Sequence, residues 1–103
     1  MKKEARSKAP DERYVIVRTY SAGCFAGLLE SRDGKEVVLR NARRLWHWKG
    51  AQTLSCLAAV GTNCPKECRV SVGVRVTLTE AIEIIDCTEA GRRSLESIPV
   101  WTA

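Results

Sequence analysis

Hydrophobic and polar residues alternate most regularly in the second half of the chain, between residues 69 and 86. The apolar residues of one parity are Val70, Val72, Val74, Val76, Leu78, Ile82 and Ile84. Only Glu80 interrupts this series. Because successive side chains of a β-strand point to opposite faces, the pattern predicts one long bent strand, or two strands that meet near Thr79 and Glu80.

Three further strands are predicted in the first half of the chain. Residues 14–20 are rich in β-branched and aromatic residues, as strands are. Residues 24–30 form the second strand, and residues 36–49 form the third, which holds two of the three tryptophans. Asp33-Gly34 has the sequence signature of a tight hairpin turn. The second and third strands are therefore expected to pair antiparallel.

Two short helices complete the pattern. Residues 51–60 carry apolar residues at the i, i+3, i+4 spacing of one helical face, and Gly61 ends this helix. Thr88 is suited to cap the start of a second helix, which Pro99 stops. Residues 100–101 are expected to finish the chain as a short edge strand or a docking arm.

This order of elements predicts an α+β fold with a mainly antiparallel sheet of five to six strands and two short helices. Residues 14–103 are expected to form a single α+β domain, and residues 1–13 a flexible basic tail. No apolar run approaches the roughly 20 residues that a membrane-spanning helix needs. We therefore expect no membrane partner.

The net charge of +5 favours anionic partners, and residues 36–49 concentrate it. Read as an unbroken strand, this segment places Arg40, Arg44, Trp46 and Trp48 on one face. The planar guanidinium group binds phosphate and carboxylate, and an indole ring stacks on a base. The same pattern is also typical of a subunit interface, or of core tryptophans beside arginines that are paired elsewhere.

Five cysteines are present, and they follow no signal peptide. An odd number of thiols without a secretory leader indicates a reducing, cytosolic compartment. Cys64 and Cys68 form one C-x₃-C pair, whereas a structural zinc site needs four ligands. His47, Cys56 and Cys87 are the residues available to complete such a site. Reduced thiols explain the pattern better, so we expect no metal ion and no cofactor.

Patterns that indicate catalysis are weak in this sequence. No local signature marks a thiol as a nucleophile activated by His47. Glu80, Glu83 and Asp86 do not all share one strand face, because Glu83 has the opposite parity. Glu80 is better interpreted as a residue at the strand bend. We therefore expect a protein that is not an enzyme.

Several segments together carry a resemblance: Arg18–Gly23, Arg40–Trp48, Leu78–Ile84, Cys87-Thr88 and Pro99–Trp101. This joint pattern resembles a family of small uncharacterised proteins encoded by bacteriophages and prophages, a domain of unknown function. The resemblance implies the cytoplasm of an infected bacterium and a small protein that works as an oligomer. It also implies one of two roles, a virion component or a counter-defence protein.

Our leading hypothesis is a non-enzymatic binding protein that forms a homo-oligomer and captures an anionic, nucleotide-like ligand between subunits. The residues expected to bind it are Arg40, Arg43, Arg44, Trp46, Trp48, Arg18 and Tyr20. An alternative is a virion structural or assembly protein that uses the same arginine and tryptophan face as a subunit interface. A second alternative is a nucleic-acid-binding protein that uses the tail and the basic strand.

Overall fold

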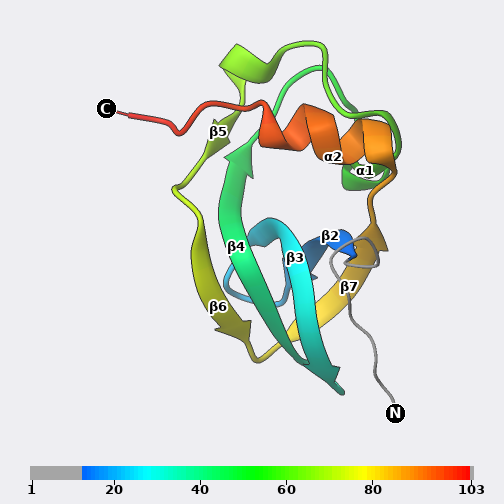
Figure 1. Ribbon diagram of the computed structural model, residues 1–103, viewed down its shortest axis with the longest axis vertical. Helices are drawn as coiled ribbons and strands as arrows, with labels where there is room; N and C mark the ends of the chain where they lie inside the picture. Colours follow the sequence, from blue (N-terminus) through cyan, green and yellow to red (C-terminus); the bar gives the residue numbers. More distant parts are fainter. Residues whose placement is uncertain (1–12, 103) are drawn as a thin grey trace.

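The computed structural model describes residues 13–102 of the 103-residue chain. The first half of the chain forms an antiparallel meander of three strands, in agreement with the sequence (Figure 1). These strands are β2 (Tyr14–Thr19), β3 (Cys24–Asp33) and β4 (Glu36–His47). Gly34, at a φ of 60°, makes the expected turn between β3 and β4. The predicted tail, residues 1–13, lies outside the described residues apart from Arg13.

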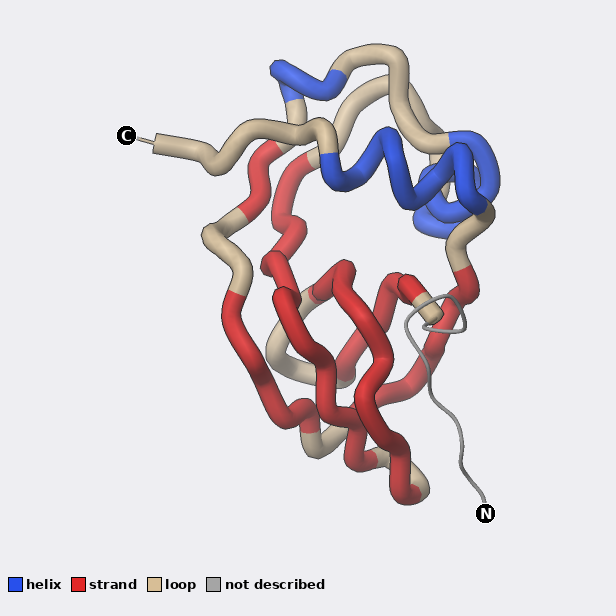
Figure 2. The backbone as a smooth tube through the Cα atoms, in the orientation of Figure 1, coloured by secondary structure: helices blue, strands red, loops and turns tan. Residues whose placement is uncertain are grey.

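The second half adds three strands to the same sheet. They are β5 (Arg69–Val70), β6 (Val74–Leu78) and β7 (Ala81–Asp86). β5 and β6 both pair with β4, whereas β7 pairs with β2. Since only Thr79 and Glu80 separate β6 from β7, the sheet must curl so that its two ends approach each other (Figure 2). The predicted meeting of two strands near these residues is confirmed, and so is the α+β fold.

Two short helices lie together over one end of the curled sheet (Figures 1 and 2). They are α1 (Leu54–Val60) and α2 (Glu89–Glu96), and a 3₁₀ turn, η2 (Pro65–Glu67), follows α1. The Thr88 hydroxyl accepts a hydrogen bond from Gly91 N at 3.0 Å, which confirms the predicted cap. Gly61 ends α1 at a φ of 77°, also as predicted. Within residues 13–102, neither helix has the length and apolar character to span a membrane.

The sheet is buried on both faces, so the protein has two apolar cores. Tyr14 and Ile16 of β2 pack with residues of α1 and α2. Val15 and Val17 of the same strand pack against residues of other strands, inside the curl. This arrangement explains why β2 begins with four consecutive buried residues, Tyr14–Val17, since burial of each apolar side chain stabilises the fold by about 1.5–3 kcal/mol.

The predicted apolar series of the second half is divided between these cores and solvent. Val70 belongs to the core beneath the helices, whereas Leu78 belongs to the core inside the curl. Val72 and Val74, between them, are 63% and 50% exposed. The chain therefore changes face between β5 and β6, and two valines are left at the surface.

The C-terminal segment after α2 attaches to the edge of the sheet. Val100 forms a parallel bridge with Val70, and Trp101 N donates to Val70 O at 3.0 Å. The expectation of a short edge strand is confirmed. Trp101 is thereby held beside the end of β4, although it lies close to the end of the chain.

Candidate functional site

A β-bulge in β4 changes the faces on which its arginines lie. Asn41 has a φ of 52°, in the left-handed region. Arg43 pairs with Ala26 and Arg40 with Leu28, so β4 has one residue more than β3 over this interval. One extra residue moves the following side chains to the other face of the strand. The prediction that Arg40 and Arg44 share a face is therefore wrong.

Arg40 lies in an ion-pair network on the helix-facing side of β4. Its Nε atom is 3.7 Å from Glu30 Oε1, and Arg75 Nη2 is 2.6 Å from Glu30 Oε2. The hydrogen bond from Arg75 lowers the pKa of Glu30 below its ordinary value, with the charges of both arginines adding to the effect. Arg40 and Arg75 thus share a carboxylate of the protein itself.

Arg43 caps the C-terminal end of α2. Its Nη1 atom donates to Leu95 O at 3.2 Å and to Glu96 O at 3.4 Å, and its Nη2 atom donates to Ile98 O. The last carbonyl groups of a helix lack partners within the helix and carry partial negative charge. A cationic fork that reaches several of them stabilises this end of α2, so Arg43 has a structural role.

Arg44 lies on the opposite face and also contacts the protein itself. Its guanidinium carbon is 4.7 Å from the centre of the Phe25 ring, and Nη1 donates to Ala22 O. Phe25 belongs to the core inside the curl, whereas Ala26, the β3 partner of Arg43, belongs to the core beneath the helices. Arg43 and Arg44 therefore point away from each other and do not form one phosphate site.

The remaining predicted ligand residues are also dispersed. Arg18 Nε lies 3.0 Å from Glu83 Oε1, on the strands at the other end of the sheet. Tyr20 follows β2 and is 78% exposed. Trp48 is half-buried and packs against the core beneath the helices. Of the seven predicted residues, only Trp46 contributes to the site described next.

Trp46 and Trp101 form an exposed pair at the end of β4. Their ring centres are 5.9 Å apart and their planes cross at 86°, an edge-to-face arrangement. Trp46 lies at a second irregularity of β4, where the register with β5 shifts between Leu45 and His47. Such a bulge re-aims a side chain. Trp46 and Trp101 are 45% and 43% exposed, respectively.

A basic pocket adjoins this pair. Arg69 places its guanidinium carbon 5.0 Å from the centre of the Trp101 ring, a cation–π contact. The pocket has a volume of about 280 Å³ and is lined by His47, Lys66, Glu67, Arg69 and Trp101. Glu67 is held by Lys49, at 3.0 Å between Oε1 and Nζ. We call the five residues that line the pocket, together with Trp46, the tryptophan surface.

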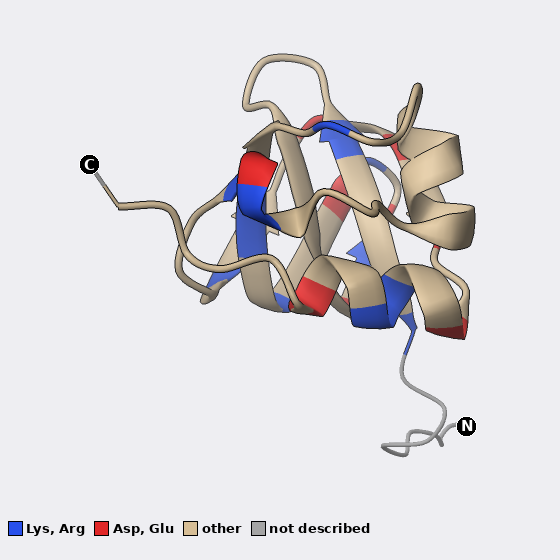
Figure 3. Cartoon of the chain, turned by 90° about the horizontal axis from the view of Figure 1, so that it is seen from above, with Lys and Arg blue, Asp and Glu red and all other residues tan. Residues whose placement is uncertain are grey.

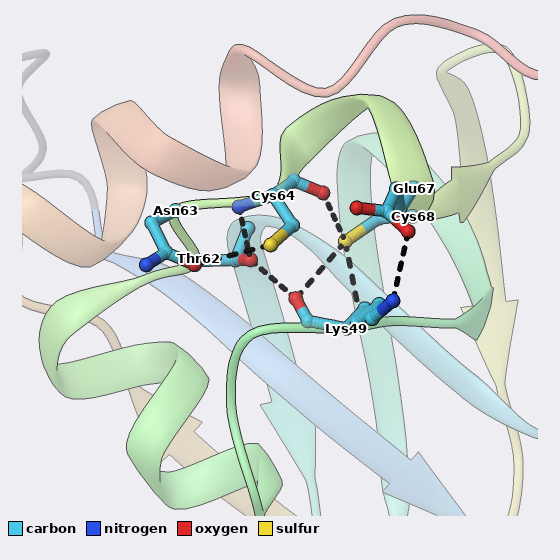
Figure 4. Close-up of polar contacts among 6 residues, drawn as sticks. All are labelled: Lys49, Thr62, Asn63, Cys64, Glu67 and Cys68. Carbon is cyan, nitrogen blue, oxygen red and sulfur yellow. Dashed lines mark hydrogen bonds and ion pairs between the residues drawn. The ribbon is translucent and has the colours of Figure 1, made fainter.

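The loop that carries Lys66 and Glu67 is fixed to the end of β4 (Figure 4). Lys49 N donates to Cys68 Sγ at 3.5 Å, and Thr62 Oγ1 donates to Lys49 O. Cys64 N donates to Thr62 Oγ1 at 2.9 Å. Cys68 is buried, so it anchors the turn η2 from beneath. These contacts hold in place the loop with Lys66 and Glu67, which forms one side of the pocket.

The charged residues of the helices lie outside this surface. Figure 3 shows that α1 carries no charged residue, whereas α2 carries both signs. On α2, Arg92 pairs with Glu96 and Arg93 with Glu89, each at 3.3 Å. The arginines of α2 are thus balanced by carboxylates on the same helix.

The other candidates from the sequence have plain structural explanations. Glu80 is exposed at the bend, and its carboxylate accepts from Ser21 Oγ at 2.8 Å, which confirms the interpretation of Glu80 as a bend residue. The five cysteines are free thiols. Within residues 13–102, no three His, Cys, Asp or Glu side chains converge as metal ligands would.

No local pattern in the sequence connects Trp101 and Arg69 with Trp46. Trp101 is 55 positions from Trp46 along the chain, and the pairing of the C-terminal segment with β5 brings them together. The available signal was the prediction that residues 100–101 form a docking arm. A tryptophan at the tip of such an arm must either be buried or form part of a surface.

Aromatic rings and cations adjoin one another on the tryptophan surface. Indole faces attract planar rings, and Arg69 and Lys66 supply positive charge beside them.

No curated protein and no solved structure matches the chain. A family model described as a domain of unknown function, DUF6948, matches residues 12–95, and the chain therefore belongs to this family.

Proposed function

We propose that this is a non-enzymatic binding protein that takes an anionic ligand with a planar ring on the tryptophan surface. One observation carries the proposal: the Arg69 guanidinium lies over the exposed Trp101 ring, which in turn contacts the exposed Trp46 ring. Positive charge and the Trp101 ring therefore share one pocket, and the Trp46 ring adjoins it.

The exposure of the two indoles supports a binding role. A large aromatic side chain stabilises a protein most when it is covered, yet both rings are more than two fifths exposed. Stacking of a base on such a ring contributes about 1–3 kcal/mol. A ligand would therefore cover apolar surface that the fold leaves in contact with water.

The charge of the pocket favours an anion over a neutral ring. Lys66 and Arg69 face one acidic residue, Glu67, and the Lys49 ammonium group already pairs with that carboxylate. The Glu67 carboxylate also raises the pKa of Lys49, chiefly through their hydrogen bond, so Lys49 stays charged. Phosphate or carboxylate groups are the natural partners of this arrangement.

The proposal keeps the ligand class expected from the sequence and moves its site. Arg40, Arg43 and Arg44 are replaced as anion-binding groups by Arg69 and Lys66, and Trp48 is replaced by Trp101. The counter-defence role remains a hypothesis that rests on the resemblance alone. A homo-oligomer is compatible with the proposal, and the pocket does not depend on it.

The test is titration of the full chain with 5′-AMP, cyclic AMP and ADP-ribose. Binding is measured by isothermal calorimetry and by tryptophan fluorescence. We expect heat and quenching with at least one of these nucleotides. Trp101→Ala and Arg69→Gln should each abolish or strongly weaken the signal. Tyr20→Ala and Arg18→Gln are matched controls, an exposed aromatic and an exposed arginine elsewhere, and should leave it unchanged. Binding that both controls reduce as much as the pocket variants would contradict the proposal.

A second candidate is a contact between copies of this chain through the same surface. Val72, Val74 and Val100 are exposed on the segments that adjoin β5, and Trp and Arg are enriched at the energetic centres of interfaces. Sedimentation velocity of the ligand-free protein separates the two functions. An oligomer that Trp101→Ala dissociates supports the contact, whereas an unchanged monomer supports the ligand site.

A further inference from the structure

The pocket of the tryptophan surface is open and does not include Trp46. Its volume is about 280 Å³, at the lower end of the roughly 300–1,000 Å³ of pockets that bury most of a small ligand, and its lining reaches Trp101 only. A ligand that uses both indoles therefore extends beyond the pocket, across Trp101 towards Trp46. We infer that the natural ligand is a segment of single-stranded nucleic acid, an inference that rests on the proposed function.

Three planar groups contact one another on this surface. The Trp46 and Trp101 rings are nearly perpendicular, so they cannot sandwich one base between them. The Arg69 guanidinium adds a third flat group over Trp101. Unstacked bases of a single strand bind on aromatic rings and on guanidinium planes. Separate planes at different angles suit successive bases of a flexible strand better than one free nucleotide.

The cations are placed to follow a chain of phosphates. Lys66 lies on the turn η2 and Arg69 on β5, and both line the pocket beside Trp101. The protein as a whole has a net charge of +5, which attracts a polyanion more strongly than a mononucleotide. A single strand thus gains from both the local and the overall charge.

Double-stranded nucleic acid fits this surface poorly. The bases of a duplex are stacked on one another, so exposed indoles have no ring to contact. Reading of the major groove uses a helix or a β-ribbon. Helix α2 has eight residues, and its arginines pair with Glu89 and Glu96, while α1 carries no charge. The exposed indoles and the character of the two helices therefore favour single strands over duplexes.

The experiment measures fluorescence anisotropy of labelled oligothymidylate and oligouridylate of about 12 nucleotides with the full chain. Competitors are thymidine monophosphate, a duplex of equal length and polyglutamate, which has charge without rings. We expect the oligonucleotides to bind at least about tenfold more tightly than each competitor, given about 1–3 kcal/mol for each stacked base. Oligodeoxyuridylate, which differs from oligouridylate only in lacking the 2′-hydroxyl group, shows whether the surface distinguishes DNA from RNA.

Variants locate the binding on the tryptophan surface. Trp46→Ala and Trp101→Ala should each weaken oligonucleotide binding by about 5- to 150-fold, whereas Trp→Phe at the same positions should retain most of it. The double variant Lys66→Gln with Arg69→Gln should reduce the slope of log K against log salt by about 1.4. Arg18→Gln, the matched control, should leave the slope unchanged. Circular dichroism confirms that each variant is folded.

The outcomes separate this inference from the proposed function. If thymidine monophosphate binds as tightly as the oligonucleotide, the inference is overturned and the proposed function stands. If neither nucleotide nor oligonucleotide binds, both are overturned. Equal binding of the duplex or of polyglutamate, or oligonucleotide binding that the Trp→Ala variants do not weaken, also overturns the inference.

Discussion

The guanidinium group of Arg43 donates a hydrogen bond to the main-chain carbonyl of Leu95, at 3.2 Å. The two residues are 52 positions apart, on β4 and on α2. This contact ties the central part of β4 to the end of the C-terminal helix. It also explains why an arginine in a basic strand contributes to stability instead of ligand binding.

Substitution of Arg43 should therefore lower the stability of the fold. We expect Arg43→Ala to reduce the free energy of unfolding by about 2–3 kcal/mol, because it leaves the carbonyls at the end of α2 without their charged donor. Urea denaturation measures this change. Arg93→Ala, on the same helix but exposed and paired only with Glu89, should cost less than about 0.5 kcal/mol. Equal losses in the two variants would contradict the capping role.

Gly91 in α2 is required by the approach of α1. A Cβ atom at this position would lie 1.9 Å from Ala58 O, a backbone atom of α1. Helix propensity alone predicts that Gly91→Ala stabilises α2 by nearly 1 kcal/mol. The clash should dominate, so we expect a net loss of about 1–3 kcal/mol and a lower melting temperature.

The control for this prediction is the neighbouring exposed residue. Ala90→Gly should lower stability by less than about 1 kcal/mol, through propensity alone. A higher melting temperature for Gly91→Ala than for the unmodified protein would show that the two helices do not pack as described.

Asn41 controls the bulge that separates the arginines of β4. Its φ of 52° suits Asn or Gly and costs a β-branched residue roughly 1–2 kcal/mol. We expect Asn41→Val to destabilise the protein by about that amount and Asn41→Gly to be nearly neutral. Thermal unfolding of both variants checks this. Equal stability of the two would indicate that β4 runs straight through position 41.

Tyr14 makes stability fall at high pH. Burial raises the pKa of Tyr14 to about 12 from its ordinary value of 10.0, and the Glu96 carboxylate adds to the effect. Between pH 10 and 12 the unfolded chain loses the phenolic proton while the folded protein keeps it, so stability decreases as pH rises. The loss should reach about 2–3 kcal/mol.

The measurement is urea denaturation at several pH values, with Tyr14→Phe for comparison. The variant should show a shallower decrease above pH 10, because it has no proton to lose. Some decrease remains, since burial also raises the pKa of the Cys87 thiol, to about 11. A Tyr14→Phe profile parallel to that of the unmodified protein would contradict the assigned pKa.

Local sequence signals were sufficient for most of the fold. The apolar run of β2, the Asp33-Gly34 turn and the Thr88 cap each depend on neighbours within a few residues, and all three are confirmed. The bend at Thr79 and Glu80 was visible as the only break in a regular alternation. These features could be predicted because the residues that determine them are close together in the sequence.

The site depends on contacts between residues that are far apart in the sequence, and the predicted set of ligand-binding residues does not come together. Strict alternation along β4 assumed an unbroken strand, but Asn41 adopts a left-handed conformation that strand pairing with β3 and β6 imposes. Arg69 and Trp101 meet only because the C-terminal segment returns to β5. Helix propensity likewise gives no reason for Gly91, whose lack of a side chain allows the two helices to approach.

The most direct test of the tryptophan surface uses the side-chain N–H signals of the three tryptophans. In ¹H–¹⁵N spectra of the full chain, titration with 5′-AMP or with oligothymidylate should shift the indole signals of Trp46 and Trp101. The signal of Trp48, which packs against the core, should stay in place. Spectra in which no indole signal moves, or in which only the Trp48 signal moves, would contradict the account.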